Sequence, residues 1–295
     1  MLRNVLLTAL TPMFFGSTYA LTTIALPPGR PLFTAAVRAL PAGILLLLAT
    51  RDIPKSRWWG RLALLGALNI GAVFALVFVA AYRMPGGVAA VISGVQPLIV
   101  ALLAVVILGE RLRPITLVAA FLGVAGVALL VLRSAFQLDT LGVAAAAGST
   151  ICGSVGIILV RHWGRPMQML SFVAWQLVFG GTMLAILAAI FEGPPPQLTG
   201  INIAAFVYLG LCSTLLAYYL WFRGVEHLGP TPVSLLSLVN PLTAAILGAV
   251  LLDETYTVAQ GIGAAMIVGA LVLGTWSSGL IRETPADPQV SAESE

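Results

Sequence analysis

The stretch Ser93–Glu110, S-G-V-Q-P-L-I-V-A-L-L-A-V-V-I-L-G-E, is an apolar run that contains one proline, with an amide directly before it and a glutamate at its end. The stretch Ser237–Glu254, S-L-V-N-P-L-T-A-A-I-L-G-A-V-L-L-D-E, repeats this design 144 residues later without a gap. Nine of the eighteen paired positions are identical. A duplicated, proline-broken apolar helix is therefore the feature from which the fold is predicted.

The composition indicates that most of the chain lies in lipid. Hydrophobic residues make up 59% of the 295 residues, charged residues only 9%, and the mean hydropathy is +1.02. A soluble domain carries roughly 25% charged residues. The net charge of +4 comes from arginines at the ends of apolar segments and does not indicate nucleic-acid binding. The lipid bilayer is the expected partner of the chain, and no nucleic acid is expected.

Ten apolar segments have the length of a membrane crossing, about 20 residues. Backbone groups in lipid must be hydrogen-bonded within helices or a closed barrel, and segments of this length exclude barrel strands. The predicted fold class is therefore an all-α integral membrane protein with ten transmembrane helices. The predicted spans are Val5–Leu26, Pro31–Thr50, Trp59–Tyr82, Gly86–Leu108, Ile115–Leu132, Leu141–Val160, Met167–Phe191, Ile201–Phe222, Thr231–Leu252 and Val258–Trp276.

The distribution of arginine and lysine predicts the orientation. Connections on the side of the N-terminus carry eleven of the fifteen basic residues, and those on the other side carry three. The last, Arg38, lies within a span. Positive residues accumulate on the cytoplasmic side of a membrane. Both termini are therefore predicted to be cytoplasmic.

With ten crossings, the two copies of the proline motif run in opposite directions through the membrane. The first copy ends inside at Glu110 and the second ends outside at Glu254. The prediction is two inverted five-helix repeats, residues 1–137 and 138–278, followed by a disordered cytoplasmic tail, 279–295. Inverted repeats are typical of transporters that bind a small-molecule solute near the midplane. The sequence leaves open whether the chain is a monomer or a homodimer.

Each proline motif brings polar groups to the centre of a span. Proline removes its own N–H and clashes with the carbonyl four residues back. That carbonyl belongs to Ser93 or Ser237, and the amide residue shares the same helix face. A freed carbonyl, a hydroxyl and an amide are expected to line a cavity at both kinks. Alternatively, these groups satisfy one another without contacting a solute. The residues concerned are Ser93, Gln96, Pro97, Ser237, Asn240 and Pro241.

Arg38 is the charged residue that lies well inside a span. A charge in that position costs at least about 2.5–3.5 kcal/mol on insertion scales, so it usually faces the bundle interior or water. One interpretation is that Arg38 pairs with a solute carboxylate. The other is structural, with the side chain holding helix-end carbonyls or reaching toward the membrane surface.

Aromatic and small polar residues on several spans complete the set of candidate cavity residues. Aromatic rings facing inward would suit a flat solute, whereas such residues also serve packing and the membrane interface. Tyrosine hydroxyls in lipid need hydrogen-bond partners, which favours a wet cavity. The further candidates are Ser17, Tyr19, Phe78, Tyr82, Trp175 and Tyr219.

The centres of the spans contain no Asp or Glu, and both histidines lie in connections. A proton antiporter normally keeps an ionisable relay in the membrane. Transport without proton coupling is therefore favoured, and proton coupling through unidentified groups is the alternative. Catalytic residues, a metal site and cofactors are not expected. A membrane-embedded enzyme or a lipid scramblase is the remote alternative, because no catalytic cluster appears.

The paired motifs resemble those of the EamA branch of the drug/metabolite transporter superfamily, in which each five-helix half carries a P-L-x-x-A…E element. The segment Ala36–Leu40, A-V-R-A-L, is similar to the arginine-bearing second helix of that family. Length and aromatic-rich helices are most similar to the YddG-like aromatic amino-acid exporters. The resemblance implies export of amino acids or related metabolites across the inner (plasma) membrane of a bacterium by alternating access, with roles for Arg38 and for both amide–proline pairs. Export of other metabolites or drugs is the alternative.

Overall fold

The computed structural model describes residues 2–83, 92–111, 114–131, 139–194, 197–251 and 257–277. Over these ranges the structure is all-helical and holds no strand, as predicted. The predicted tail, 279–295, lies outside the described residues. The helices of the first half are α1 Leu2–Ala25, α2 Pro31–Thr50, η1 Ser56–Trp58, α3 Trp59–Gly66, η2 Ala67–Ala72, α4 Val73–Arg83, α6 Gln96–Leu108 and α7 Pro114–Val131.

The second half has a similar order of elements, but among the described residues it lacks a 3-10 helix like η1 and adds α12. Its helices are α8 Thr140–Trp163, α9 Met169–Phe191, α10 Gly200–Gly210, η3 Leu211–Leu216, α11 Ala217–Leu228, α12 Pro230–Leu236, α13 Val239–Leu251 and α14 Val258–Ser277. The helices α8 and α9 begin 138 residues after α1 and α2, and η3 begins 144 residues after η2. The boundaries of the two repeats stay a prediction that these offsets support.

Six helical segments within the described ranges are long and apolar enough to cross a membrane, and three apolar helices are shorter. The long ones include the composite segments Ser56–Arg83 and Gly200–Leu228, in which η2 and η3 join two α-helices. Large apolar side chains such as Val106, Phe121 and Ile190 are more than 60% exposed, as expected of residues that face lipid. The number of ten crossings and the orientation stay predictions.

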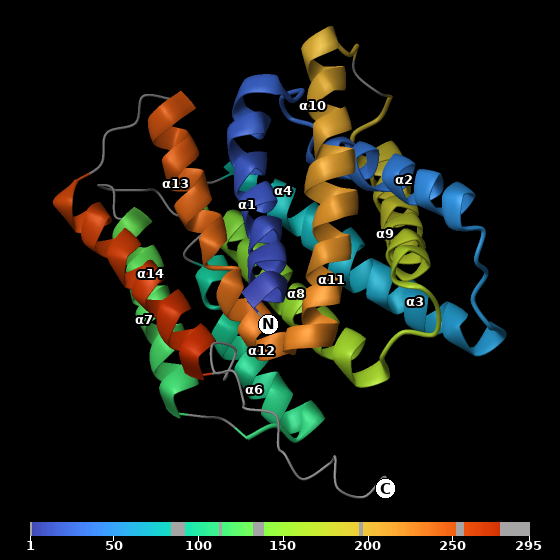
Figure 1. Cartoon of the computed structure of the whole chain (residues 1–295). Coiled ribbons are helices and arrows are strands. Elements are labelled where there is room, and N and C mark those ends of the chain that lie inside the picture. The colour runs from blue at the N-terminus through green and yellow to red at the C-terminus, as the bar shows by residue number, and fades with distance from the viewer. Residues whose placement is uncertain are drawn as a thin grey trace, which may run out of the picture.

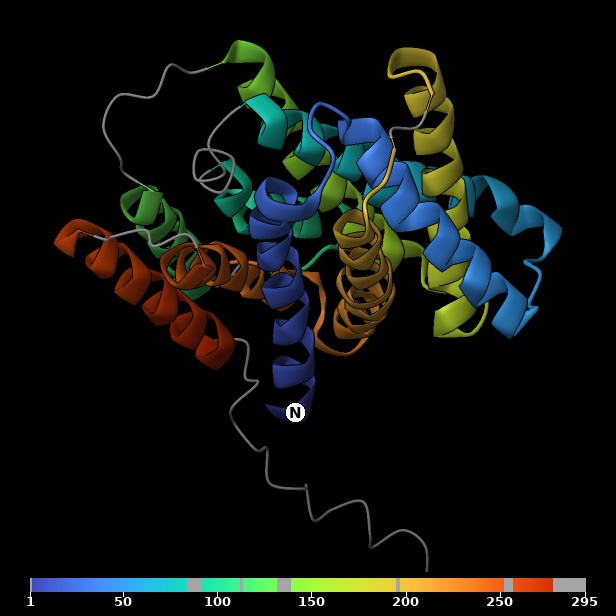
Figure 2. The same ribbon diagram turned by 90° about the horizontal axis from the view of Figure 1, so that it is seen from above.

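Two helix pairs form opposite edges of the bundle, with α7 beside α14 at one edge and α2 beside α9 at the other (Figures 1 and 2). Small residues allow these close approaches. A Cβ atom added to Gly43 would lie 2.9 Å from the Cβ of Leu177, and one added to Gly181 would lie 2.8 Å from the Cα of Leu40. Between these pairs, α1 packs against α11 and α13 near the middle of the molecule.

Both proline motifs break their helices, as their prolines require. Helix α12 ends at Leu236, and α13 starts at Val239 after a turn. The corresponding break before α6 lies at Val95. The prediction that the carbonyl of Ser237 is free is wrong. That oxygen accepts a hydrogen bond from the backbone N–H of Asn240 at 3.0 Å. A tighter turn supplies a local partner in place of the N–H that Pro241 lacks.

The composite segments each contain a π-helical stretch, η2 or η3. In η3 the backbone N–H of Ala217 donates to the carbonyls of Cys212 and Thr214. It therefore does not bond the carbonyl of Ser213, which would be its partner in an α-helix. In η2 the N–H of Val73 donates to the carbonyl of Ile70 and does not bond the carbonyl of Asn69. One carbonyl per stretch is thereby released from the usual i→i−4 pattern.

Candidate functional site

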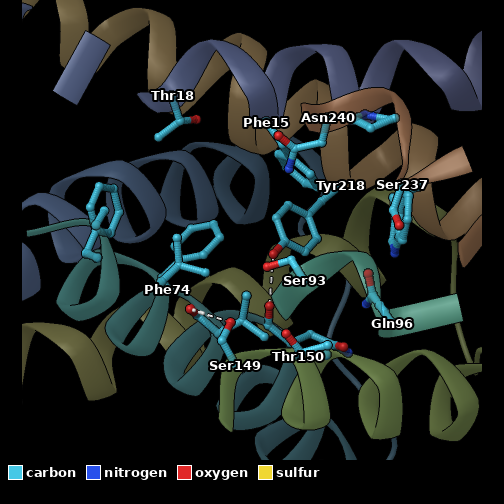
Figure 3. A pocket seen from close by; sticks show the side chains of 18 of the residues that line it. Phe15, Thr18, Phe74, Ser93, Gln96, Ser149, Thr150, Tyr218, Ser237 and Asn240 are labelled. Atoms are coloured by element: carbon cyan, nitrogen blue, oxygen red, sulfur yellow. Dashed lines mark hydrogen bonds between the residues drawn. The ribbon is translucent and has the colours of Figure 1, made fainter. Parts of the chain in front are cut away.

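A cavity of about 150 Å³ lies in the middle of the bundle, between elements of both halves (Figure 3). The cavity extends from Pro12 and Trp221 to Thr22 and Ala81. Thr22 and Ala81 lie near the C-terminal ends of α1 and α4. The lining residues are Pro12, Phe15, Thr18, Thr22, Arg38, Asn69, Val73, Phe74, Val77, Phe78, Ala81, Ser93, Gln96, Ser149, Thr150, Gly153, Ile157, Tyr218, Trp221, Ser237 and Asn240.

The two proline breaks meet at one side of this cavity. Ser93 and Gln96 from the first motif lie opposite Ser237 and Asn240 from the second, and a 40 Å³ recess between them connects the breaks. Glycine on α1 allows the backbone of the second break to approach closely. A Cβ added to Gly16 would lie 2.7 Å from the backbone carbonyl oxygen of Asn240. The structure therefore gathers the polar residues of both motifs in one place.

Arg38 is buried, with 3% of its surface exposed, and it lines the cavity. Its Nε donates to Oγ1 of Thr214 at 2.7 Å, and its Nη2 donates to the carbonyl of Ser213 at 2.6 Å. Its guanidinium carbon lies 4.5 Å from the centre of the Phe74 ring. Such hydrogen bonds and ring faces offset part of the desolvation of a buried charge. Arg38 thus bonds a backbone carbonyl, although one within a helical segment and not at a helix end, and it places a positive charge on the cavity wall. Its pairing with a solute carboxylate stays a prediction.

Aromatic rings form another wall. Phe15 packs against Tyr218 with ring centres 5.6 Å apart and against Trp221 at 6.3 Å. Phe74 packs against Tyr218 at 5.8 Å. In Figure 3 Tyr218 lies near the middle of the labelled residues, with Phe15 and Asn240 above it and Ser93 below it. These rings offer flat apolar faces to a solute.

Hydroxyl groups on α1 and α8 line the remaining surface. Thr22 donates to the carbonyl of Thr18 at 2.7 Å, Thr150 to Ala146 at 2.8 Å, and Ser149 to Val73 at 3.3 Å. A hydroxyl group has one hydrogen to donate and two lone pairs to accept with. With these hydrogens directed at backbone carbonyls, the hydroxyl oxygens are available to accept hydrogen bonds from a solute.

Several predicted site residues lie elsewhere. Ser17 is hydrogen-bonded to Phe14 and Tyr208, and Tyr82 donates to the Pro27 carbonyl at 2.8 Å. These bonds satisfy the hydroxyls away from the cavity. The side chain of Tyr19 lies outside the described residues. Pro97 and Pro241 are buried and shape the breaks without lining the main cavity.

Trp175 and Tyr219 also lie away from the cavity. Trp175 donates to the carbonyl of Asp52 at 2.9 Å and stacks edge-on with Trp59 at 4.8 Å, which is packing at a helix end. Tyr219 does not line the cavity, because its neighbour Tyr218 occupies the inward face of α11. Adjacent residues on a helix point about 100° apart.

Sequence reasoning missed a buried amide pair beside the cavity. Nδ2 of Asn69 donates to Oε1 of Gln176 at 2.9 Å, and the hydroxyl of Tyr218 donates to the Asn69 carbonyl at 2.9 Å. Both amides are at most 4% exposed. The sequence does carry a signal for this pair, because Asn69 and Gln176 are uncharged amides near the centres of two predicted spans. The other lining residues outside the predicted set include Thr18, Thr22, Ser149, Thr150 and Trp221.

A second recess of about 280 Å³ lies at the opposite end of α6. It is lined by the exposed residues Glu110, Arg111, Arg161 and His227. The Nη1 atom of Arg161 donates to the carbonyl of Glu226 at 3.0 Å. The recess therefore presents charges of both signs at the end of the bundle that holds the N-terminus. Between the recess and the central cavity, α6 packs against α12.

Known proteins resemble this chain over nearly its whole length. The model of the EamA-like transporter family matches residues 2–132 and again 140–276. Protein PecM of Dickeya dadantii is 41% identical over 264 residues, 89% of either chain. The inner membrane transporter YedA of Escherichia coli is 28% identical, covering 95% of this chain and 92% of that protein. A crystal structure with 23% identity superposes with a TM-score of 0.77 over 93% of this chain and 98% of the solved chain, which supports the fold.

Proposed function

This chain belongs to the EamA-like transporter family, and from that premise we propose that it exports amino acids, aromatic ones in particular, across the bacterial inner membrane. The observation that carries the proposal is the pairing of two kinds of polar surface on one cavity. Arg38 supplies positive charge, and Thr22, Ser149 and Thr150 supply oxygens that are available to accept hydrogen bonds.

A zwitterion matches this pairing. An α-carboxylate is attracted to the side of Arg38, because ionised groups form stronger hydrogen bonds than neutral ones. An α-ammonium group donates three hydrogen bonds and accepts none, so it suits the hydroxyl oxygens. The rings of Phe15, Phe74 and Trp221 supply the flat contact that an aromatic side chain prefers.

The size of the cavity distinguishes between two classes of solute. Sites for drug-sized ligands are about 300–1,000 Å³. The central cavity, at about 150 Å³, is smaller and favours a metabolite over a drug. Export of other small metabolites is the second candidate, because the amides Gln96 and Asn240 can recognise many polar groups.

We further propose alternating access, in which solute enters through the recess at Arg111 and Arg161 and leaves by way of the central cavity. The recess lies at the end of the bundle that holds the N-terminus and the cavity lies in its middle, and the packed helices α6 and α12 extend from one toward the other. Two inverted repeats with both termini cytoplasmic would place the recess on the cytoplasmic side.

The test is uptake by proteoliposomes of radiolabelled phenylalanine, tryptophan and threonine, with a cationic dye in a parallel assay. We expect saturable flux of phenylalanine and tryptophan that exceeds threonine flux. Amino-acid flux no greater than that of empty vesicles would contradict the proposal. Dye flux without amino-acid flux would instead support drug export.

A further inference from the structure

The two carbonyl groups released by the π-helical stretches occupy equivalent positions. Asn69 in η2 and Ser213 in η3 are 144 residues apart, which is the offset between the two proline motifs. Both carbonyls are bypassed by the backbone N–H group that would bond them in an α-helix. The same irregularity has therefore been placed at the same position in both halves of the chain.

Each released carbonyl is bonded by a side chain from the other half. The Asn69 carbonyl accepts from the hydroxyl of Tyr218 on α11 at 2.9 Å, and the Ser213 carbonyl accepts from Nη2 of Arg38 on α2 at 2.6 Å. Tyr218 and Arg38 also line the central cavity. The groups that a solute would touch are thus the groups that complete the backbone hydrogen bonding of η2 and η3.

The side chains next to these carbonyls are paired in the same symmetric way. Ser213 Oγ accepts from Arg38 at 2.9 Å, and Asn69 donates to Gln176 at 2.9 Å. Arg38 and Gln176 are 138 residues apart, the offset between α2 and α9. Each second helix of a half therefore holds the π-helical stretch of the opposite half through a polar side chain at the same position.

This arrangement gives each stretch two satisfied states. In lipid, a backbone carbonyl that loses its partner must find another within the protein. The Ser213 carbonyl can accept either from Arg38 or, after a return to α-helical pairing, from the N–H of Ala217. The Asn69 carbonyl has the same choice between Tyr218 and the N–H of Val73. A change of pairing alters the twist of the helix and moves the half of it that follows.

We infer that Arg38 and Tyr218 are positioning residues of the transport cycle, which couple occupancy of the cavity to the hydrogen-bonding state of η3 and η2. A carboxylate in the cavity competes with the Ser213 carbonyl for Arg38, and a ring that displaces Tyr218 releases the Asn69 carbonyl. The released stretch re-pairs and shifts α4 or α11. This inference rests on the proposed function for the identity of the solute, and on the geometry alone for the coupling.

The test is the variant Tyr218→Phe, which keeps the ring and removes only the hydroxyl that bonds Asn69. We expect hydrogen–deuterium exchange to accelerate at the amides of residues 69–74, a segment far from Tyr218 in the sequence. In flux assays we expect the maximal rate to change about three- to tenfold, the range expected of one hydrogen bond, with KM within about twofold. The control is Tyr219→Phe, which alters the neighbouring tyrosine outside the cavity and is expected to change neither quantity.

The two measurements separate this inference from the proposed function. Unchanged exchange at residues 69–74 in a monodisperse Tyr218→Phe protein would overturn the coupling, whatever the flux. Accelerated exchange in a protein that carries no amino acid would retain the coupling and contradict only the solute. An unchanged maximal rate in a protein that does carry amino acids would also overturn the coupling role of Tyr218.

Discussion

The side chain of Asn69 lies directly against Gly156, so that a Cβ atom added to residue 156 would be 2.6 Å from Cγ of Asn69. Only a residue without a side chain fits there while Asn69 keeps its bond to Gln176. The same close approach allows α8 to pass η2 beside the cavity. Gly156 therefore controls the position of an amide that Tyr218 also contacts through the Asn69 backbone.

We expect Gly156→Ala to lower the melting temperature and the transport rate together. An added methyl group in a packed interior costs about 1–3 kcal/mol, and Asn69 would have to leave Gln176. The matched control is Gly261→Ala on α14, where a Cβ would meet no atom within 4 Å. That change is expected to be neutral or slightly stabilising, since alanine favours helices over glycine. Thermal unfolding in detergent gives the melting temperatures of the two variants, and flux in proteoliposomes gives their transport rates. Equal melting temperatures of the two variants would contradict the prediction.

Gln96→Ala and Asn240→Ala are expected to raise KM for the solute at least about fivefold, the effect of losing one hydrogen bond of about 1 kcal/mol. Both amides line the cavity, so their loss should leave the melting temperature nearly unchanged. Gln260→Ala is the contrasting variant. Its side chain is buried and bonds the Leu130 carbonyl at 3.1 Å, so we expect lower stability with an unchanged KM. Concentration-dependent flux at equal expression checks all three, and wild-type KM in both cavity variants would assign these amides a structural role only.

Flux is expected to be insensitive to an imposed pH gradient. The described residues that line the central cavity include no Asp, Glu or His that could exchange a proton with water. Arginine does not release its proton in proteins. The measurement is counterflow and net flux in proteoliposomes with equal or different internal and external pH. Severalfold stimulation by the gradient would show that transport is coupled to protons.

The first turn of α8 is expected to lose stability in acid through Asp139. The backbone N–H of Gly142 and, to a smaller extent, Arg83 hold the pKa of this partly exposed carboxylate below its ordinary value, while partial desolvation opposes them. A lowered pKa in the folded state means that the carboxylate stabilises the fold above the unfolded pKa, near 3.8, and loses that effect as the pH falls through the folded value.

The variant Asp139→Asn tests this contribution, since asparagine can still accept from Gly142 but cannot pair with Arg83 at 3.1 Å. We expect the wild type to lose more of its melting temperature than the variant between pH 6 and pH 3. Parallel melting curves for the two proteins over that range would contradict the prediction.

Solute capture is expected to depend on Arg111 in the second recess. Arg111→Gln removes a positive charge from its lining, and we expect a lower kcat/KM for amino acids presented on that side, with the difference shrinking at high salt. The control is Arg57→Gln, an exposed arginine of η1 that does not line the recess. A fall of kcat/KM that is equal in both variants would indicate a general effect of surface charge.

The sequence by itself determined the fold class and the location of the helix breaks, because both follow from local chemistry. Apolar segments of membrane length must be helical in lipid, and proline at 97 and 241 cannot continue the hydrogen bonding of the preceding turn. The 144-residue offset of the motifs also indicated two related halves, and the same family model matches each half of the chain.

Only the tertiary structure decided which polar residues share a cavity, because that depends on how helices are rotated and on contacts between residues far apart in the chain. Tyr218 faces inward and Tyr219 does not, although both are tyrosines in one helix. Neither the pairing of Asn69 with Gln176 nor the π-helical stretches follow from local propensity, since each is satisfied by side chains more than 100 residues away. The proline motifs are visible in the sequence because their cause is local, and the carbonyl groups bonded by Arg38 and Tyr218 are not, because their cause is the packing of one half against the other.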